Sequence, residues 1–173
     1  LEGVIYEEIT YEGYGPCGVA LLVESLTDNR NRTVAELRHI FSRNNGNLAD
    51  SGAVSWNFER KGVIIVTKAS FTEDDIMNVI LEAGADDLID EDDYYEIKTP
   101  IEGFESVRKS LEAAGYKIDS ASLQFVAKNT VKLEAKEAEQ TIKLISAVED
   151  NDDVQNVYSN ADIDAKVMEA IST

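Results

Sequence analysis

YEGYGPCGVALLVESLTDNRNRTVAELRHIFSRNNGNLADSGAVSWNFERKG, residues 11–62, is the stretch around which this chain is organised. It contains the only cysteine, the only histidine and the only tryptophan of the 173 residues. It also contains the one dense group of arginines in the sequence. Because the remaining sequence is acidic and regular, we expect any functional signal to lie here.

The first half of this stretch predicts a strand that follows a tight turn. Residues 1–12, which lead into it, alternate loosely and indicate an entering strand. Residues 13–18 are rich in turn formers, and residues 19–26 form a short apolar run that suits a buried strand. The turn contains a formal G-x-G-x-x-G pattern, but it precedes a strand, whereas a dinucleotide-binding fingerprint opens a helix. We therefore interpret it as a structural hairpin.

The second half predicts a helix and then a strand. Apolar residues recur at helical spacing over Thr33–Asn44, and Thr33 with Glu36 fits a capping box. Asn45-Gly46 indicates the C-terminal end of this helix. Residues 53–58 alternate as a strand, which would place the tryptophan on the same face as two apolar side chains.

Residues 63–128 predict a unit of their own with the element order βαββαβ. Its expected elements lie at residues 63–67, 72–83, 85–89, 94–98, 99–114 and 117–127. A capping box at residues 72–75 and a glycine at position 84 mark the two ends of the first helix. This order is typical of a split βαβ, or ferredoxin-like, domain.

After residue 128 the chain predicts a short strand, a helix, an acidic turn, a strand and an amphipathic tail. With residues 19–58, these elements would complete a second split βαβ unit. We therefore predict an α+β fold of two ferredoxin-like domains, the second inserted into the first. The outer domain comprises residues 1–62 plus 129–173, and the acidic inserted domain comprises residues 63–128. The rival is three loosely tandem pieces, although an isolated αβ pair cannot bury both its faces.

Charge is distributed unevenly along the chain. The formal net charge is −18, yet residues 28–62 contain six Lys or Arg against four Asp or Glu. The acidic remainder repels a phosphate backbone. Any nucleic-acid contact therefore passes through the arginine-rich stretch or through a part of the protein outside this sequence.

Six basic residues form the candidate nucleic-acid-binding set: Arg30, Arg32, Arg38, Arg43, Arg60 and Lys61. The forked donors of arginine suit phosphate oxygens, which favours a contacting surface. The alternative is a solvated helix face with one or two ion pairs to Glu36 or Glu59. The pattern alone leaves both interpretations open.

No catalytic residue, metal site or cofactor is predicted, and we expect the chain not to be an enzyme. One cysteine and one histidine exclude a Cys/His metal site within one chain. His39 has no nucleophile motif beside it, and Cys17 suits a small packing residue in a turn. The acidic run at residues 90–93 lacks the glycine and glutamate spacing of an EF-hand loop, so it suits a solvated turn.

The expected location is the cytoplasm. A lone cysteine allows no internal disulfide, which fits a reducing compartment. No apolar run approaches the ~20 residues that span a bilayer, and residues 1–10 have no signal-peptide pattern. The sequence does not begin with Met, so we expect it to be part of a longer protein.

Several motifs resemble those of the YebC/PmpR family, which includes the mitochondrial translational activator of cytochrome oxidase. They are Y-E-G-Y-G-P-x-G at residues 11–18, L-T-D-N-R-N-R-T-V-A-E-x-R-H at 26–39, G-N-L at 46–48, V-x-W-x-F-x-R-K-G at 54–62 and E-D-N-D-D-V-Q-N-V-Y-S-N at 149–160. Together they cover most of the chain. The family usually has glycine at the position of Cys17, which argues against an essential thiol.

The resemblance implies a basic helical N-terminal domain followed by two α/β domains, the third inserted into the second. The basic domain is absent from this sequence. The family is described as transcriptional regulators that bind DNA, and members also as ribosome-associated translation factors.

The resemblance thus implies a non-enzymatic regulator of gene expression. Its partner would be DNA, or alternatively the ribosome through ribosomal RNA or tRNA, with help from the missing basic domain and without a membrane partner. A ligand-binding or oligomerisation module is the remaining alternative.

Overall fold

The computed structural model of this chain describes residues 3–172 and separates into two compact units. The first unit joins the two ends of the chain, up to Phe58 and from Ala127 onward, and the second consists of Glu59–Val126. Each unit packs helices against a four-stranded sheet in which antiparallel pairs predominate. The predicted α+β class is therefore confirmed.

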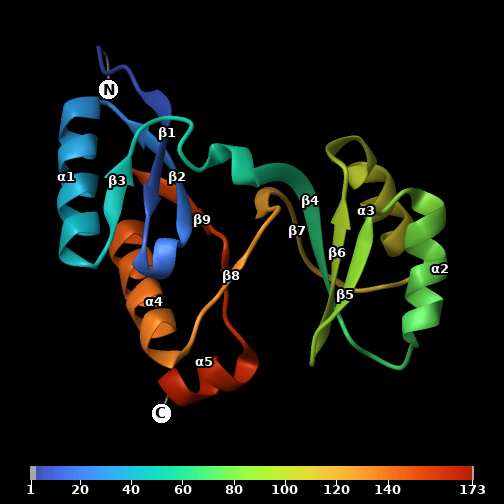
Figure 1. The fold of residues 1–173 in the computed structure, drawn as a ribbon. Helices are drawn as coiled ribbons and strands as arrows, with labels where there is room; N and C mark the ends of the chain where they lie inside the picture. Colours follow the sequence, from blue (N-terminus) through green and yellow to red (C-terminus); the bar gives the residue numbers. More distant parts are fainter. Residues whose placement is uncertain (1–2, 173) are drawn as a thin grey trace. The chain divides into compact units, whose positions relative to one another are not determined.

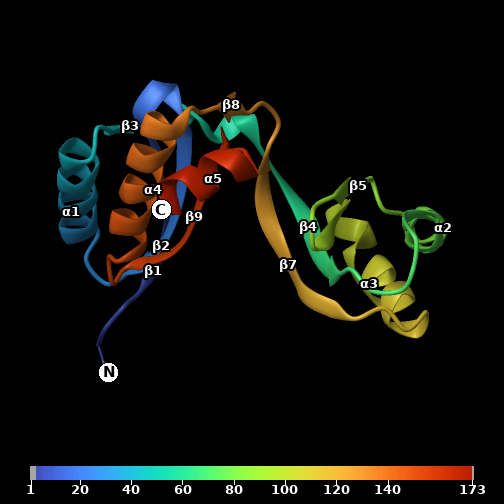
Figure 2. The same cartoon turned by 90° about the horizontal axis from the view of Figure 1, so that it is seen from below.

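The first unit is built on a sheet with the strand order β3-β1-β2-β9. Its strands are β1 (Glu7–Tyr14), β2 (Ala20–Thr27), β3 (Asn47–Ala49) and β9 (Val154–Ser159). Helices α1 (Arg30–Arg43) and α4 (Ala135–Glu149) lie side by side against it (Figures 1 and 2). Their buried residues pack on Leu21 and Val23 of β2.

The first unit has a second, smaller hydrophobic cluster beside its main core. The short strands β8 (Val131–Lys132) and β10 (Ala161–Asp162) pair in parallel, and helix α5 (Ala165–Ser172) follows them. Val19 and Leu133 are buried at the centre of this cluster, where residues of α5 pack against them.

The glycine-rich turn at residues 13–18 is a hairpin, as predicted. It joins β1 to β2 in an antiparallel pair that begins with Tyr14 opposite Ala20. Its tip is the single 3-10 turn η1 (Pro16–Gly18), where Cys17 takes a φ of 58°. A Cβ on Gly13 would lie 2.5 Å from Cε2 of Phe41, so only glycine allows α1 to approach β1 this closely.

The predicted strand over residues 53–58 is wrong. Residues Ser55–Asn57 form the 3-10 turn η2, and the next strand begins only at Phe58. The cause is the carboxylate of Glu12, which accepts backbone N–H bonds from this loop that a strand would give to a neighbour. Trp56 consequently remains 64% exposed instead of facing a core.

The first unit therefore does not repeat the predicted βαββαβ order. The expected entering strand forms β1, which occupies a central position between β3 and β2. The third strand of the unit is the short β3, which directly follows α1. The expected strand near residue 130 pairs with β10 outside the main sheet.

The second unit has the element order β4-α2-β5-β6-α3-β7 and the sheet order β5-β6-β4-β7. Its elements are β4 (Phe58–Thr67), α2 (Glu73–Ala83), β5 (Asp87–Asp90), β6 (Tyr94–Thr99), the 3-10 turn η3 (Ile101–Gly103), α3 (Phe104–Ala113) and β7 (Ile118–Ala127). The predicted capping box of α2 is confirmed, with Thr72 and Asp75 exchanging hydrogen bonds. This helix ends at Gly84, as predicted, and the glycine takes the left-handed conformation.

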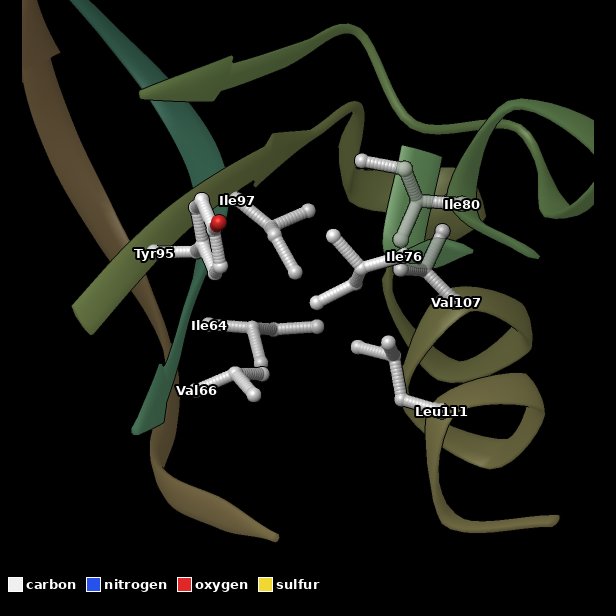
Figure 3. Close-up of a cluster of buried hydrophobic side chains, with 8 residues drawn as sticks. All are labelled: Ile64, Val66, Ile76, Ile80, Tyr95, Ile97, Val107 and Leu111. Carbon is white, nitrogen blue, oxygen red and sulfur yellow. The ribbon is translucent and has the colours of Figure 1, made fainter. Parts of the chain in front are cut away.

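The core of the second unit lies between the sheet and its two helices. Figure 3 shows the side chains of Ile64, Val66 and Ile97 on the sheet side, facing those of the helices. Ile76 of α2 and Leu111 of α3 complete the contact and are fully buried. Burial of each such side chain contributes on the order of 1.5–3 kcal/mol.

Hydrogen bonds within the first unit join the two segments through which the chain passes to and from the second unit. Asn57 donates its side-chain amide to the carbonyl of Asn129 at 3.0 Å and accepts the Asn129 N–H at 2.9 Å. The side chain of Asn160 adds a bond to the same carbonyl and accepts the N–H of Ala20. The asparagine side chains thus satisfy backbone groups that have no strand partner where the chain leaves and re-enters the first unit.

Candidate nucleic-acid interface

Helix α1 carries four of the six candidate residues: Arg30, Arg32, Arg38 and Arg43. The helix begins at Arg30 because the side-chain oxygen of Asn29 accepts the backbone N–H of Arg32 at 3.1 Å. The predicted capping role of Thr33 is therefore wrong. Its side chain is buried in a hydrogen-bond network, and the first turn of the helix includes Arg30 and Arg32.

Arg32 ties α1 to the turn between α4 and β9. Its Nη2 lies 2.9 Å from Oδ1 of Asp28 and 2.9 Å from Oδ1 of Asp153. Thr33 donates its hydroxyl hydrogen to the other oxygen of Asp153 at 2.7 Å. Hydrogen bonds to Asp153 and Asp28 raise the pKa of the Arg32 guanidinium above its ordinary value. Arg32 thus joins two motifs that lie about 120 residues apart in sequence.

The other arginines of α1 are less constrained. Arg30 Nε lies 3.7 Å from Oε1 of Glu7, and both side chains are about half exposed or more, so this pair contributes little to stability. Arg38 and Arg43 are exposed. Within residues 3–172 neither has a side-chain hydrogen bond or an ion pair. Their charges are available to a partner.

The remaining two candidates belong to the second unit. Arg60 lies over the ring of Phe125, 5.4 Å from its centroid. Lys61 Nζ forms an ion pair with Asp86 at 2.9 Å, and this hydrogen bond raises the pKa of the lysine. The six predicted residues are therefore divided between two units, and Lys61 is committed to an ion pair.

A cleft of about 700 Å³ lies between α1 and the turn that follows α4. Arg32, Glu36 and His39 line it from α1, and Asp150 and Asp152 line it from the turn. Such a charged lining differs from the mainly apolar pockets that hold small organic ligands.

Residues 3–172 show neither a metal-binding cluster nor a membrane span. They hold no group of three or more His, Cys, Asp or Glu side chains arranged to bind a metal ion. Among the same residues, none of the helices is both long and apolar enough to cross a membrane.

The two motifs that meet at Asp153 both lie within a region that matches a known protein family. Residues 6–161 match the model of a protein family described as the TACO1/YebC second and third domain. The chain belongs to the TACO1/YebC family. This finding confirms the family resemblance of the arginine-rich and acidic motifs.

Relatives within the TACO1/YebC family are similar over almost all of this chain. A probable transcriptional regulatory protein of Chlorobium phaeobacteroides is 50% identical over 173 residues, which cover 99% of this chain and 69% of the relative. One of Geobacter sp. (strain M21) is 52% identical over 169 residues, which cover 98% and 68%. The crystal structure of a conserved hypothetical protein from Aquifex aeolicus matches with a TM-score of 0.82 and 41% identity, covering 95% and 68%.

Sequence reasoning missed the partner of the arginine-rich motif. Asp153 lies in an acidic run that we expect only to form a turn, yet it receives bonds from Arg32 and Thr33. The one hint that the two segments could pair was their opposite charge, since one family motif is rich in arginine and the other is acidic. Periodicity could not pair them, because it carries no information about contacts between distant segments.

Proposed function

We propose that this chain belongs to a non-enzymatic, cytoplasmic regulator of gene expression that contacts the phosphates of a nucleic acid through helix α1. The names of the TACO1/YebC relatives support the regulatory part of the proposal. The observation that carries the contacting part is the exposed pair Arg38 and Arg43, which lack ion-pair partners among the described residues of an acidic chain.

The six candidate residues have different tasks in this proposal. Arg30, Arg38 and Arg43 contact phosphates, because they are exposed and weakly held. Arg32 positions the N-terminal turn of α1 through Asp28 and Asp153. Arg60 adds a secondary contact from the second unit, and Lys61 stays in its ion pair with Asp86.

The test replaces the three contacting arginines together. The variant Arg30→Gln/Arg38→Gln/Arg43→Gln removes three charges without touching the core. A matched control, Lys109→Gln/Lys117→Gln/Lys166→Gln, removes three exposed charges elsewhere. Binding to duplex DNA, ribosomal RNA and ribosomes is measured for both at several salt concentrations.

We expect the arginine variant to bind its partner more weakly, with a shallower salt dependence than the control. For duplex DNA, the slope of log affinity against log salt falls by about 0.9 for each phosphate that the variant no longer neutralises. Unchanged binding of DNA, ribosomal RNA and ribosomes by the arginine variant would refute the proposal.

The same measurement separates the two gene-expression roles. A transcriptional regulator prefers particular duplex sequences at physiological salt, whereas a translation factor sediments with ribosomes. Duplex binding that ignores sequence and disappears at moderate salt would rule out the transcriptional version.

A further inference from the structure

A second hollow, of about 300 Å³, lies where the C-terminal end of α1 meets the first two and a half turns of α4. Three cations from the two helices line it: Arg43, Lys136 and Lys143. The side-chain amides of Asn44 and Gln140 contribute further hydrogen-bonding groups, and Glu139 is the one carboxylate in the lining. We name this site the basic hollow.

The charge of the basic hollow is unusual for this chain. The sequence has 34 Asp or Glu against 16 Lys or Arg, and several of its cations form ion pairs with carboxylates. Lys61, Lys68 and Arg108, for example, each form an ion pair. In residues 3–172, none of the three cations of the basic hollow forms an ion pair within 4.0 Å.

The packing of the two helices sets where these cations emerge from the backbone. Lys136 and Lys143 are seven residues apart, which places them on the same face of α4, two turns from each other. Phe41 and Leu144, both fully buried, hold α1 against α4 beneath the hollow. A Cβ on Gly46 would lie 2.8 Å from the carbonyl oxygen of Tyr14, so the segment after α1 is also closely packed.

The amide groups are suited to an oxyanion in the same place. Asn44 already donates from its Nδ2 to the carbonyl of Ile40 at 2.8 Å, which orients its side chain at the rim. A phosphate group needs several donors around its free oxygens, and amides supply them beside the cations.

We propose that the basic hollow is a binding site for a backbone phosphate of a nucleic acid. The proposal rests on the proposed function and extends it by adding Lys136 and Lys143 of α4 to the contacting surface. Arg43 belongs to both the α1 surface and the hollow, so the bound strand continues from one helix to the other. Glu139 opposes the bound phosphate and limits the affinity.

The test uses variants of α4 only, so that α1 remains intact. The variant Lys136→Gln/Lys143→Gln is compared with Lys109→Gln/Lys117→Gln, which removes two exposed lysines of the second unit. A third variant, Glu139→Gln, removes the opposing carboxylate. Each is titrated with a labelled single-stranded RNA and a labelled DNA duplex between about 50 and 200 mM salt.

We expect the Lys136→Gln/Lys143→Gln variant to bind several-fold more weakly than the wild type. Its salt slope should fall by about 0.7 for single strands or 0.9 for duplex DNA, since the two lysines no longer neutralise the one phosphate in the hollow. The Glu139→Gln variant should bind more tightly than the wild type. A phosphate in the hollow predicts these opposite signs, and the Lys109→Gln/Lys117→Gln control separates this local effect from a change in net charge.

Three results would overturn the inference, and they differ from one another. If the wild type binds and the Lys136→Gln/Lys143→Gln variant binds equally well, only the basic hollow is refuted. If the wild type binds no RNA, DNA or ribosome, the proposed function fails together with the hollow. If inorganic phosphate alone shifts the NMR signals of Asn44 and Gln140 while nucleic-acid binding is unchanged in the variant, the hollow is a site for free anions instead.

Discussion

Glu12 illustrates how one side chain decides the course of a loop. Its carboxylate is only 5% exposed and accepts N–H bonds from Gly52, Val54 and Ser55 at 2.7, 2.9 and 2.7 Å. Burial raises the pKa of this carboxyl group, but the three backbone donors together outweigh burial and leave the pKa below its ordinary value. Glu12 therefore stabilises the fold in its ionised form.

Replacing Glu12 by Gln should destabilise the first unit by about 2 kcal/mol at neutral pH, because the amide cannot make the charge-assisted hydrogen bonds of the carboxylate. The folded pKa of Glu12 lies below that of the unfolded chain. Its contribution is therefore present above the unfolded pKa and disappears as pH falls through the folded pKa. Urea unfolding across this range should show the wild type and Glu12→Gln converging at acidic pH.

The control for this prediction is Glu8→Gln on the same strand. Glu8 is exposed, so the substitution should leave the urea midpoint nearly unchanged. A Glu12→Gln variant as stable as Glu8→Gln at neutral pH would show that the carboxylate does not hold the loop.

At the scale of elements, a glycine in the hairpin between β1 and β2 determines how closely α1 packs against the sheet. The absent side chain of Gly13 leaves room for the ring of Phe41, which is fully buried. This contact lies beneath the helix that carries the candidate arginines, so the position of those arginines depends on a glycine in a strand.

Replacing Gly13 by Ala should destabilise the chain by about 1–3 kcal/mol, since the added methyl group overpacks the site. Thermal unfolding measures the loss. Gly13→Ala should cost less stability when it is made in a Phe41→Leu background than in the wild type, because the smaller side chain leaves room for the methyl group. If Gly13→Ala destabilises the Phe41→Leu variant as much as the wild type, the contact with the Phe41 ring is not the cause of the destabilisation.

Most elements could be predicted from the sequence because their signals are local. Helical periodicity located α2 and α3, and the capping box at Thr72 marked the start of α2 correctly. The course of residues 53–58 could not be predicted, because it depends on Glu12, some forty residues away. The pairing of Asp153 with Arg32 was hidden for the same reason, at a separation of 121 residues.

The candidate site shows the same limit. Composition located the basic residues, but only the fold separates the bonded Arg32 from the exposed Arg38 on the same helix. Lys136 and Lys143 gave no sequence signal of their own, since they lie in a helix of mixed charge. Their role in the basic hollow emerges only from the packing of α4 beside α1.

On the scale of the whole molecule, charge restricts where a nucleic acid can bind. The second unit carries sixteen Asp or Glu and seven Lys or Arg, so its surface repels phosphate. The first unit has 18 Asp or Glu and nine Lys or Arg, hence the same net charge, but four of its cations lie on α1 and two on α4. The central claim is therefore that α1 uses its arginines in two ways, Arg32 for the fold and Arg38 with its exposed neighbours for a partner.

The most direct measurement compares Arg32→Gln with Arg38→Gln, using thermal unfolding and nucleic-acid binding on the same samples. Arg32→Gln should lower the unfolding temperature and leave binding by the folded protein unchanged. Arg38→Gln should leave the unfolding temperature unchanged and reduce the salt slope on duplex DNA by about 0.9. Equal weakening of binding by both variants, with equal unfolding temperatures, would contradict the division of roles.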